Sequence, residues 1–112
     1  MGEREGLPPV ELAALLSVMR LGDESYGVSV RSEIEERTGR SPSIAAVYAA
    51  LERLEGRGHV EAWLSDPVPE RGGRARRHYR LTVAGAEALK REQAVAERLW
   101  AGVGVHPALR GR

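Results

Sequence analysis

A short, strongly basic segment limits the possible folds of this chain more than any other feature. Residues 71–80 read RGGRARRHYR, with five arginines and no acidic residue, although the net charge of the whole chain is only +1. Residues 59–65 alternate apolar and polar side chains before it, and prolines and the pair Gly72-Gly73 separate the two stretches. This order predicts a β-hairpin with strands at 59–65 and 74–81. A hairpin so rich in arginine favours contact with phosphate groups.

The two predicted strands each have an inner and an outer side. The first places Val60, Ala62 and Leu64 inward and Trp63 outward. In the second, the outer side forms a positive row made of Arg74, Arg76, His78 and Arg80. Arg77 shares the inner side with Tyr79, so it either leans onto the core or contacts a phosphate.

Two helices are predicted at the start of the chain. Apolar residues at helical spacing run from Val10 to Leu21, after Pro8-Pro9 and before Gly22, and predict a first helix. Asp23-Glu24-Ser25 then favours a helix start, so a second helix is expected over about 24–38. Its expected inner side consists of Tyr26, Val30 and Ile34, with Val28 as a further candidate. Gly27 within it indicates close packing between helices.

A third helix follows after a connection of only a few residues. Ser41-Pro42-Ser43 provides two possible caps, and Ile44, Val47, Leu51 and Leu54 repeat at helical spacing until Gly56 and Gly58. So short a joint is typical of a helix-turn-helix, although a simple helical hairpin has the same length.

A last helix is expected from Thr82 to about Gly102. Small and apolar residues recur on it in a heptad pattern that favours a dimer seam, formed by Ala86, Leu89, Gln93, Ala96, Trp100 and Val103. Trp100 has two interpretations: it packs in the dimer, or it forms an aromatic wall for a flat effector molecule.

The order of elements predicts a mainly α (α+β) fold, a winged helix-turn-helix with a C-terminal dimerisation helix. The expected organisation is a DNA-binding domain at 8–82, a dimerisation helix at 83–103 and a disordered tail at 104–112. The basic hairpin is the wing.

Several classes of protein are disfavoured by composition. The chain has no cysteine, which excludes disulfides, thiolate metal sites and a cysteine nucleophile. Its three histidines lack metal-site spacing, and no nucleophile stands near a base in any recognisable motif. We therefore expect no enzyme activity, no metal and no cofactor. The absence of a signal sequence or of about 20 consecutive apolar residues favours a cytoplasmic protein without a membrane segment.

Three stretches of the sequence resemble the PadR family of bacterial transcriptional regulators. They are SYG at 25–27, SPSIAAVYAALERLEGRGHVE at 41–61 and RRHYRLTVAG at 76–85. The resemblance covers roughly residues 10–100. It implies a homodimer that binds operator DNA, usually as a repressor, with the last helix at the dimer interface. Some members of the family release DNA on binding small aromatic compounds. The single C-terminal helix is similar to the short form of the family.

The expected DNA-contacting residues lie on the third helix and the wing. The third helix is expected to enter the major groove, where only Arg53 is suited to a bidentate contact with guanine and alanines suit thymine methyl groups. Tyr48 is either a core aromatic or a hydroxyl that reaches a phosphate. The full set is Ser41, Ser43, Ala45, Ala46, Tyr48, Ala49, Arg53, Arg71, Arg74, Arg76, Arg77 and Arg80.

Two functions from different classes remain open at this point. The first is a sequence-specific transcriptional regulator, a repressor that binds double-stranded DNA at an inverted repeat and responds to an aromatic effector. The alternative is a winged helix that binds another protein, which the arginine-rich wing disfavours. The operator, the regulated genes and the effector do not follow from the sequence.

Overall fold

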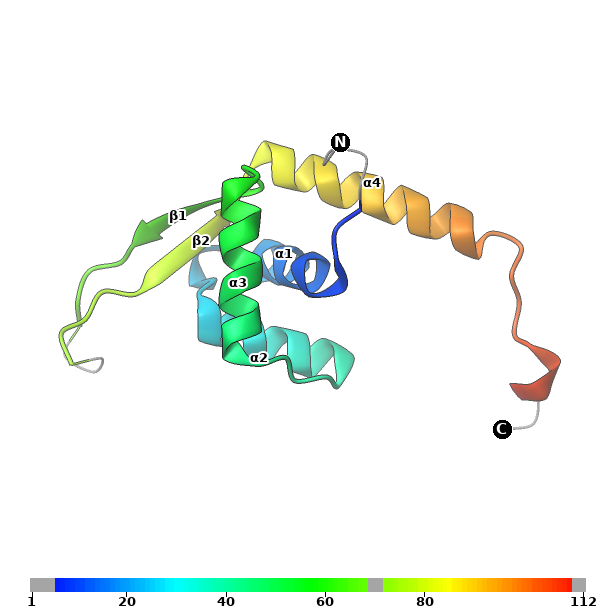
Figure 1. The fold of residues 1–112 in the computed structure, drawn as a ribbon, viewed down its shortest axis with the longest axis horizontal. Coiled ribbons are helices and arrows are strands. Elements are labelled where there is room, and N and C mark those ends of the chain that lie inside the picture. Colours follow the sequence, from blue (N-terminus) through cyan, green and yellow to red (C-terminus); the bar gives the residue numbers. More distant parts are fainter. Residues whose placement is uncertain (1–5, 69–71, 110–112) are drawn as a thin grey trace.

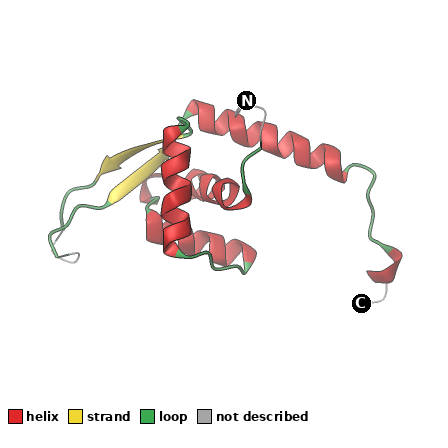
Figure 2. Cartoon of the chain, in the orientation of Figure 1, coloured by secondary structure: helices red, strands yellow, loops and turns green. Residues whose placement is uncertain are grey.

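The computed structural model describes residues 6–68 and 72–109 and is mainly helical, with one two-stranded sheet (Figure 2). In chain order the elements are α1 (Pro9–Leu21), η1 (Gly22–Glu24), α2 (Gly27–Thr38), α3 (Ile44–Gly56), β1 (Val60–Leu64), β2 (Arg77–Leu81), α4 (Val83–Trp100) and η3 (Pro107–Leu109). This is the winged helix-turn-helix with a C-terminal helix that the order of sequence patterns predicted. The hairpin β1–β2 forms the wing, which extends away from the three-helix unit (Figure 1).

Local signals produced the predicted ends of three helices. Pro9 begins α1, and Gly22, with φ of 59°, ends it in a conformation that favours glycine. The Ser43 Oγ accepts a hydrogen bond from the Ala46 N–H and caps α3. At the start of α4, the Thr82 Oγ1 accepts from the Gly85 N–H at 3.0 Å.

The predicted start of the second helix was wrong. Residues Gly22–Glu24 form a short 3₁₀ turn, and α2 begins only at Gly27. Ser25 is fully buried, and its Oγ donates to the carbonyls of Gly22 and Val18. These bonds hold Ser25 in a non-helical conformation, so the helix does not begin at Asp23-Glu24-Ser25. Tyr26 is extended and forms a β-bridge with His78. It therefore lies outside the helix.

The core lies between α1, α2 and α3. Val30 and Ile34 of α2 are buried as expected, whereas Val28 is exposed and faces away from the core. On α3 the first-turn Ile44 is exposed, against the prediction. The main buried apolar residues are Ala14, Leu15, Val18, Val30, Ile34, Val47, Ala50, Leu51, Leu54, Val60, Tyr79 and Leu89.

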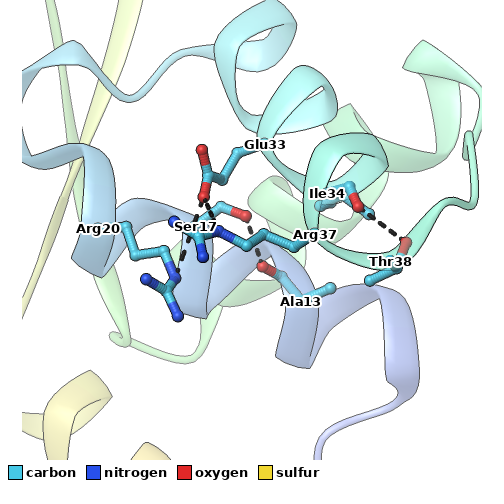
Figure 3. Close-up of polar contacts among 7 residues, drawn as sticks. All are labelled: Ala13, Ser17, Arg20, Glu33, Ile34, Arg37 and Thr38. Atoms are coloured by element: carbon cyan, nitrogen blue, oxygen red, sulfur yellow. Dashed lines mark hydrogen bonds and ion pairs between the residues drawn. The ribbon is translucent and has the colours of Figure 1, made fainter.

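Polar contacts also join α1 to α2. Glu33 of α2 accepts a hydrogen bond from the Arg37 Nε at 2.8 Å and lies 4.0 Å from the Arg20 Nε of α1 (Figure 3). Ser17 donates to the Ala13 carbonyl within α1. The half-buried Glu33 thus connects the two helices and helps to orient the helix-turn-helix.

The wing is an antiparallel pair in which Val60 pairs with Leu81 and Trp63 with His78. The backbone N–H of Tyr79 donates to the Ser25 carbonyl at 2.9 Å, so the segment before α2 lies along the free edge of β2. Three expectations about the strands were wrong. The second strand begins at Arg77 and not at Arg74. Leu64 is exposed because the hairpin leaves the core before this residue, and His78 is buried although it shares the outer side with the arginines.

Within the described residues, helix α4 packs on the winged unit mainly through its first half. Gly85, Ala88 and Leu89 are buried there, while the second half extends away from the winged unit (Figure 1). At Gly85 an added Cβ would overlap the His59 carbonyl oxygen and lie 2.8 Å from the Leu81 Cδ1. Glycine therefore allows the close approach of α4 to the start of β1.

Candidate nucleic-acid interface

A groove of about 360 Å³ lies between the wing, the start of α2 and the outer side of α3. Three arginines and two tyrosines line it together with small and apolar residues, and the full lining is Tyr26, Gly27, Val28, Tyr48, Arg74, Ala75, Arg76 and Arg77. The groove joins the predicted recognition helix to the predicted wing, and three of the wing arginines line it.

Tyr48 lies across the first turn of α2 at the floor of this groove. It is 48% exposed, so the interpretation as a core aromatic was wrong. A Cβ added at Gly27 would lie 2.7 Å from the Tyr48 Oη and closer still to the ring. The close packing of helices expected at Gly27 is therefore real, and its partner is the Tyr48 ring.

Two positions on α3 add detail to the predicted exposed side, on which Arg53 is exposed as expected. Arg53 lies five residues after Tyr48 and thus about 140° away around the helix axis. Its Nη1 is 3.8 Å from the Glu11 Oε2 of α1, so the guanidinium points toward α1. The reasoning from sequence also missed the exposed Glu52, whose spacing from Ala45 and Ala49 places it on their side of the helix.

Ser43 caps α3, and Ser41 donates to Glu35 of α2. Both serines therefore contribute to the turn between the two helices. Ala45 is exposed, and Ala46 and Ala49 are half-buried, so the predicted recognition surface is made mainly of small side chains.

The wing arginines have different environments. Arg77 donates through Nη2 to both carboxylate oxygens of Glu55 at 2.9 and 2.8 Å, and these bonds raise its pKa. Its guanidinium also lies 5.9 Å from the ring centroid of Tyr79. Burial raises the pKa of the Tyr79 hydroxyl, and the nearby Arg77 opposes that shift. Arg77 thus leans onto the inner side of the wing, which agrees with the first of the two interpretations given for it.

Arg76 and Arg80 lie on the outer side of the wing, as predicted. The Arg76 guanidinium carbon is 3.9 Å from the ring centroid of Tyr26, and that of Arg80 is 4.5 Å from Trp63. Arg80 also lies 3.7 Å from Asp23 and 3.8 Å from Glu61. Arg74 is exposed at the groove, and Arg71 lies outside the described residues.

The acidic partners of these arginines come from other parts of the chain. Residues 71–80 contain no acid, but Glu55, Asp23 and Glu61 lie opposite Arg77 and Arg80 after folding. Of the arginines that line the groove, Arg77 is thus paired with an acid of α3.

The predicted dimer seam on α4 divides into two parts. Leu89 is only 7% exposed and belongs to the core of its own protomer, whereas Ala86, Gln93, Ala96, Trp100 and Val103 are exposed. The reasoning from sequence missed Val95 and Leu99. The spacing 88-92-95-99 shows that these two continue the buried side of α4 into its exposed half.

A second polar cluster lies where α1, α3 and α4 meet. Glu11 is almost fully buried, and its carboxylate lies 3.2 Å from the Arg57 Nη1. Burial is the main cause that lowers the pKa of His59, whose Nδ1 has no hydrogen-bond partner in the described structure. Among residues 6–68 and 72–109, no group of three acidic or histidine side chains could hold a metal ion.

No helix within the described part of the chain is long and apolar enough to cross a membrane.

The model of the transcriptional regulator PadR-like family matches residues 15–91, which include the whole wing and the first half of α4. The match confirms the resemblance that the motifs indicated. Among curated protein sequences, none matches the chain significantly.

Solved structures with the same fold are also similar to the chain. A PadR family transcription regulator from Clostridium difficile is 20% identical, with a TM-score of 0.65 over 83% of this chain and 95% of that one. A PadR family regulator from Eggerthella lenta is 24% identical, with a TM-score of 0.66 over 81% and 77%. BpsR of Bordetella bronchiseptica, whose DNA binding is regulated by 6-hydroxynicotinic acid, is 21% identical, with a TM-score of 0.62 over 91% and 70%.

Proposed function

The chain belongs to the PadR-like family of transcriptional regulators, and from this premise we propose that it is a repressor that binds an inverted-repeat operator as a homodimer. The family is one of DNA-binding regulators and not of enzymes. The proposal concerns the form of the DNA site, the residues that contact it and the assembly that binds it.

The groove between the wing and α3 carries the proposal. Arg74 and Arg76 line it from the wing and Tyr48 from α3, so cationic and hydroxyl donors gather at one surface. We assign α3 to the major groove, where the exposed Ala45 and the half-buried Ala49 are suited to thymine methyl groups. Tyr48 supplies a single hydroxyl, which suits a phosphate better than the paired donors of a base edge.

The exposed half of α4 supports a homodimer. Leu99 is 75% exposed and Trp100 71% exposed, Val95 lies one turn before Leu99, and Val103 follows the end of the helix, outside the helical span that was expected to reach about Gly102. A second copy of the helix would cover this apolar stripe. Two-fold symmetry then requires an inverted repeat whose half-sites are about 10 bp apart, or a multiple of that spacing.

An effector site at Trp100 is the second part of the proposal. The DNA binding of BpsR is regulated by 6-hydroxynicotinic acid, a small aromatic acid. Trp100 is an exposed aromatic ring on the proposed dimer seam and is suited to stack with such a molecule. Packing between protomers is the competing role of the same ring.

The proposal is tested by the salt dependence of DNA binding. In the double variant Arg74→Ala/Arg76→Ala, specific and non-specific affinity should both fall, and the slope of log K against log salt should lessen by about one for each lost phosphate contact. Lys90→Ala removes an exposed cation of α4 and serves as the control. An unchanged slope would remove the groove from the DNA interface and favour a protein-binding module.

Selection of bound duplexes from a random pool tests the symmetry of the site. We expect a dyad-symmetric sequence, and a selected site without dyad symmetry would contradict the homodimer on an inverted repeat. Repression is tested separately, by transcription from a promoter that carries the selected site.

A further inference from the structure

The outer side of the wing carries a continuous stack of side chains from three segments. Tyr26 precedes α2, Trp63 belongs to β1, and His78 of β2 lies between them. The ring centroids of Tyr26 and His78 are 5.5 Å apart, and those of His78 and Trp63 are 5.2 Å apart with the planes inclined by 29°. These separations are typical of interacting rings.

An arginine of the wing lies over each outer ring. The Arg76 guanidinium carbon is 3.9 Å from the Tyr26 centroid, and that of Arg80 is 4.5 Å from Trp63. Both distances fall within the about 6 Å over which a cation is attracted to an aromatic face. We call the five side chains the cation–aromatic stack: Arg76, Tyr26, His78, Trp63 and Arg80.

His78 is the central member of the stack and its most buried one. His78 is only 9% exposed. Its side chain contacts the segment before α2, since its Nδ1 lies 2.7 Å from the Asp23 carbonyl oxygen. A carbonyl only accepts, so Nδ1 carries the hydrogen and donates it. The backbone of His78 also pairs with Trp63 on one side and bridges to Tyr26 on the other. Its removal would leave a gap between the two outer rings.

The two arginines at the ends of the stack differ in charge balance. Arg80 lies near Asp23 and Glu61, whereas Arg76 makes no ion pair within the described residues. Arg76 also lines the groove beside Tyr48. The aromatic face therefore holds the Arg76 guanidinium in place without neutralising it, which lowers the entropy lost when it binds an anion.

We propose that His78 is a positioning residue for DNA binding, which holds Tyr26 in place and through it fixes Arg76 at the groove. The inference rests on the proposed function, since it assigns His78 a role in the same DNA interface. His78 itself contacts no DNA, and it acts through the order that it imposes on Arg76.

A double-mutant cycle tests this role. Binding of a fluorescently labelled, mixed-sequence DNA duplex is measured by anisotropy over a salt series for wild type, His78→Ala, Arg76→Ala and the double variant. We expect each single variant to weaken binding and to reduce the salt slope by up to about one. In the Arg76→Ala background, His78→Ala should have no further effect. His78→Phe should retain most of the affinity because the ring stack persists, and His106→Ala removes an exposed histidine as the control.

The outcomes separate this inference from the function on which it rests. Wild type that fails to bind the duplex even at low salt overturns both. Wild type that binds, with additive losses in the cycle or with an unchanged salt slope for His78→Ala, overturns the role of His78 alone. If His78→Ala does not fold, the same cycle is run with Trp63→Ala, which removes a half-exposed ring of the stack. Additive losses there refute the role equally.

Discussion

The substitution Gly27→Ala is expected to separate DNA binding from stability. The new Cβ would lie 2.7 Å from the Tyr48 Oη and closer still to two ring carbons, whereas unbonded heavy atoms normally approach to about 3.5–4.0 Å, so the ring must move by more than about 1 Å. Tyr48 is half-exposed and its ring can turn outward. The obstacle is thus the far end of a movable side chain.

The expected change in the free energy of unfolding is small. Displacing a side chain from its preferred rotamer costs about 0.5–1.5 kcal/mol. Replacing glycine by alanine in a helix contributes up to about 1 kcal/mol in the opposite direction. The two effects nearly cancel, so we expect the melting temperature to change by no more than about 4–8 °C, the shift that corresponds to 1 kcal/mol.

The expected loss of DNA affinity is larger. A hydrogen bond to a charged group is worth about 1.5–3 kcal/mol, so moving the Tyr48 hydroxyl away from a phosphate should weaken binding about tenfold or more. The salt slope should stay the same because the tyrosine is neutral. Anisotropy titrations and calorimetric unfolding measure the two quantities on the same protein.

Gly85→Ala is the matched control. There the added Cβ meets the His59 backbone carbonyl, which cannot turn aside, so we expect a loss of about 1–3 kcal/mol in stability. A Gly27→Ala variant that melts as low as Gly85→Ala, or that binds DNA like wild type, would refute the reasoning. So would a loss of affinity from Gly27→Ala that persists unchanged when Tyr48 is alanine.

Three further predictions concern α4 and the polar cluster beside it. The double variant Leu99→Glu/Trp100→Glu should sediment as a folded monomer because both side chains are exposed in the protomer, and a persistent dimer would place the interface elsewhere. Glu11→Gln should lower the free energy of unfolding, measured by urea titration, by less than the about 3–5 kcal/mol of a fully buried ion pair, because its partner Arg57 is partly exposed. An unchanged free energy would show that the pair adds nothing. Burial lowers the pKa of His59, so the unfolded chain binds its proton first, and stability should fall as the pH drops below about 6.5. The variant His59→Gln should lose that part of the acid sensitivity in thermal unfolding, and an equal pH dependence in both proteins would contradict the assignment.

The elements that could be predicted from the sequence depend on local interactions. Pro9, Ser43 and Thr82 act within one helical turn of their own positions, and the apolar spacing of α3 selects its buried side. Together with the basic hairpin, these signals were enough for the winged helix-turn-helix. The family followed from the resemblance of residues 25–27, 41–61 and 76–85 to its motifs.

The details of the site depend on residues that are distant in sequence. The orientations of Arg53 and Arg77 depend on Glu11 and Glu55, which lie on other elements. Residues that share the outer side of a strand look equivalent in the sequence, yet His78 is buried because Tyr26 lies against it.

The sequence by itself determined which segments form helices, strands and turns, since caps, glycines and apolar spacing act over a few residues. Only the tertiary structure decided which wing arginines meet acids of other elements and which part of α4 stays uncovered. Ala88 and Leu99 illustrate this difference. Both lie on the same side of one helix, but the core of the protomer covers only the first.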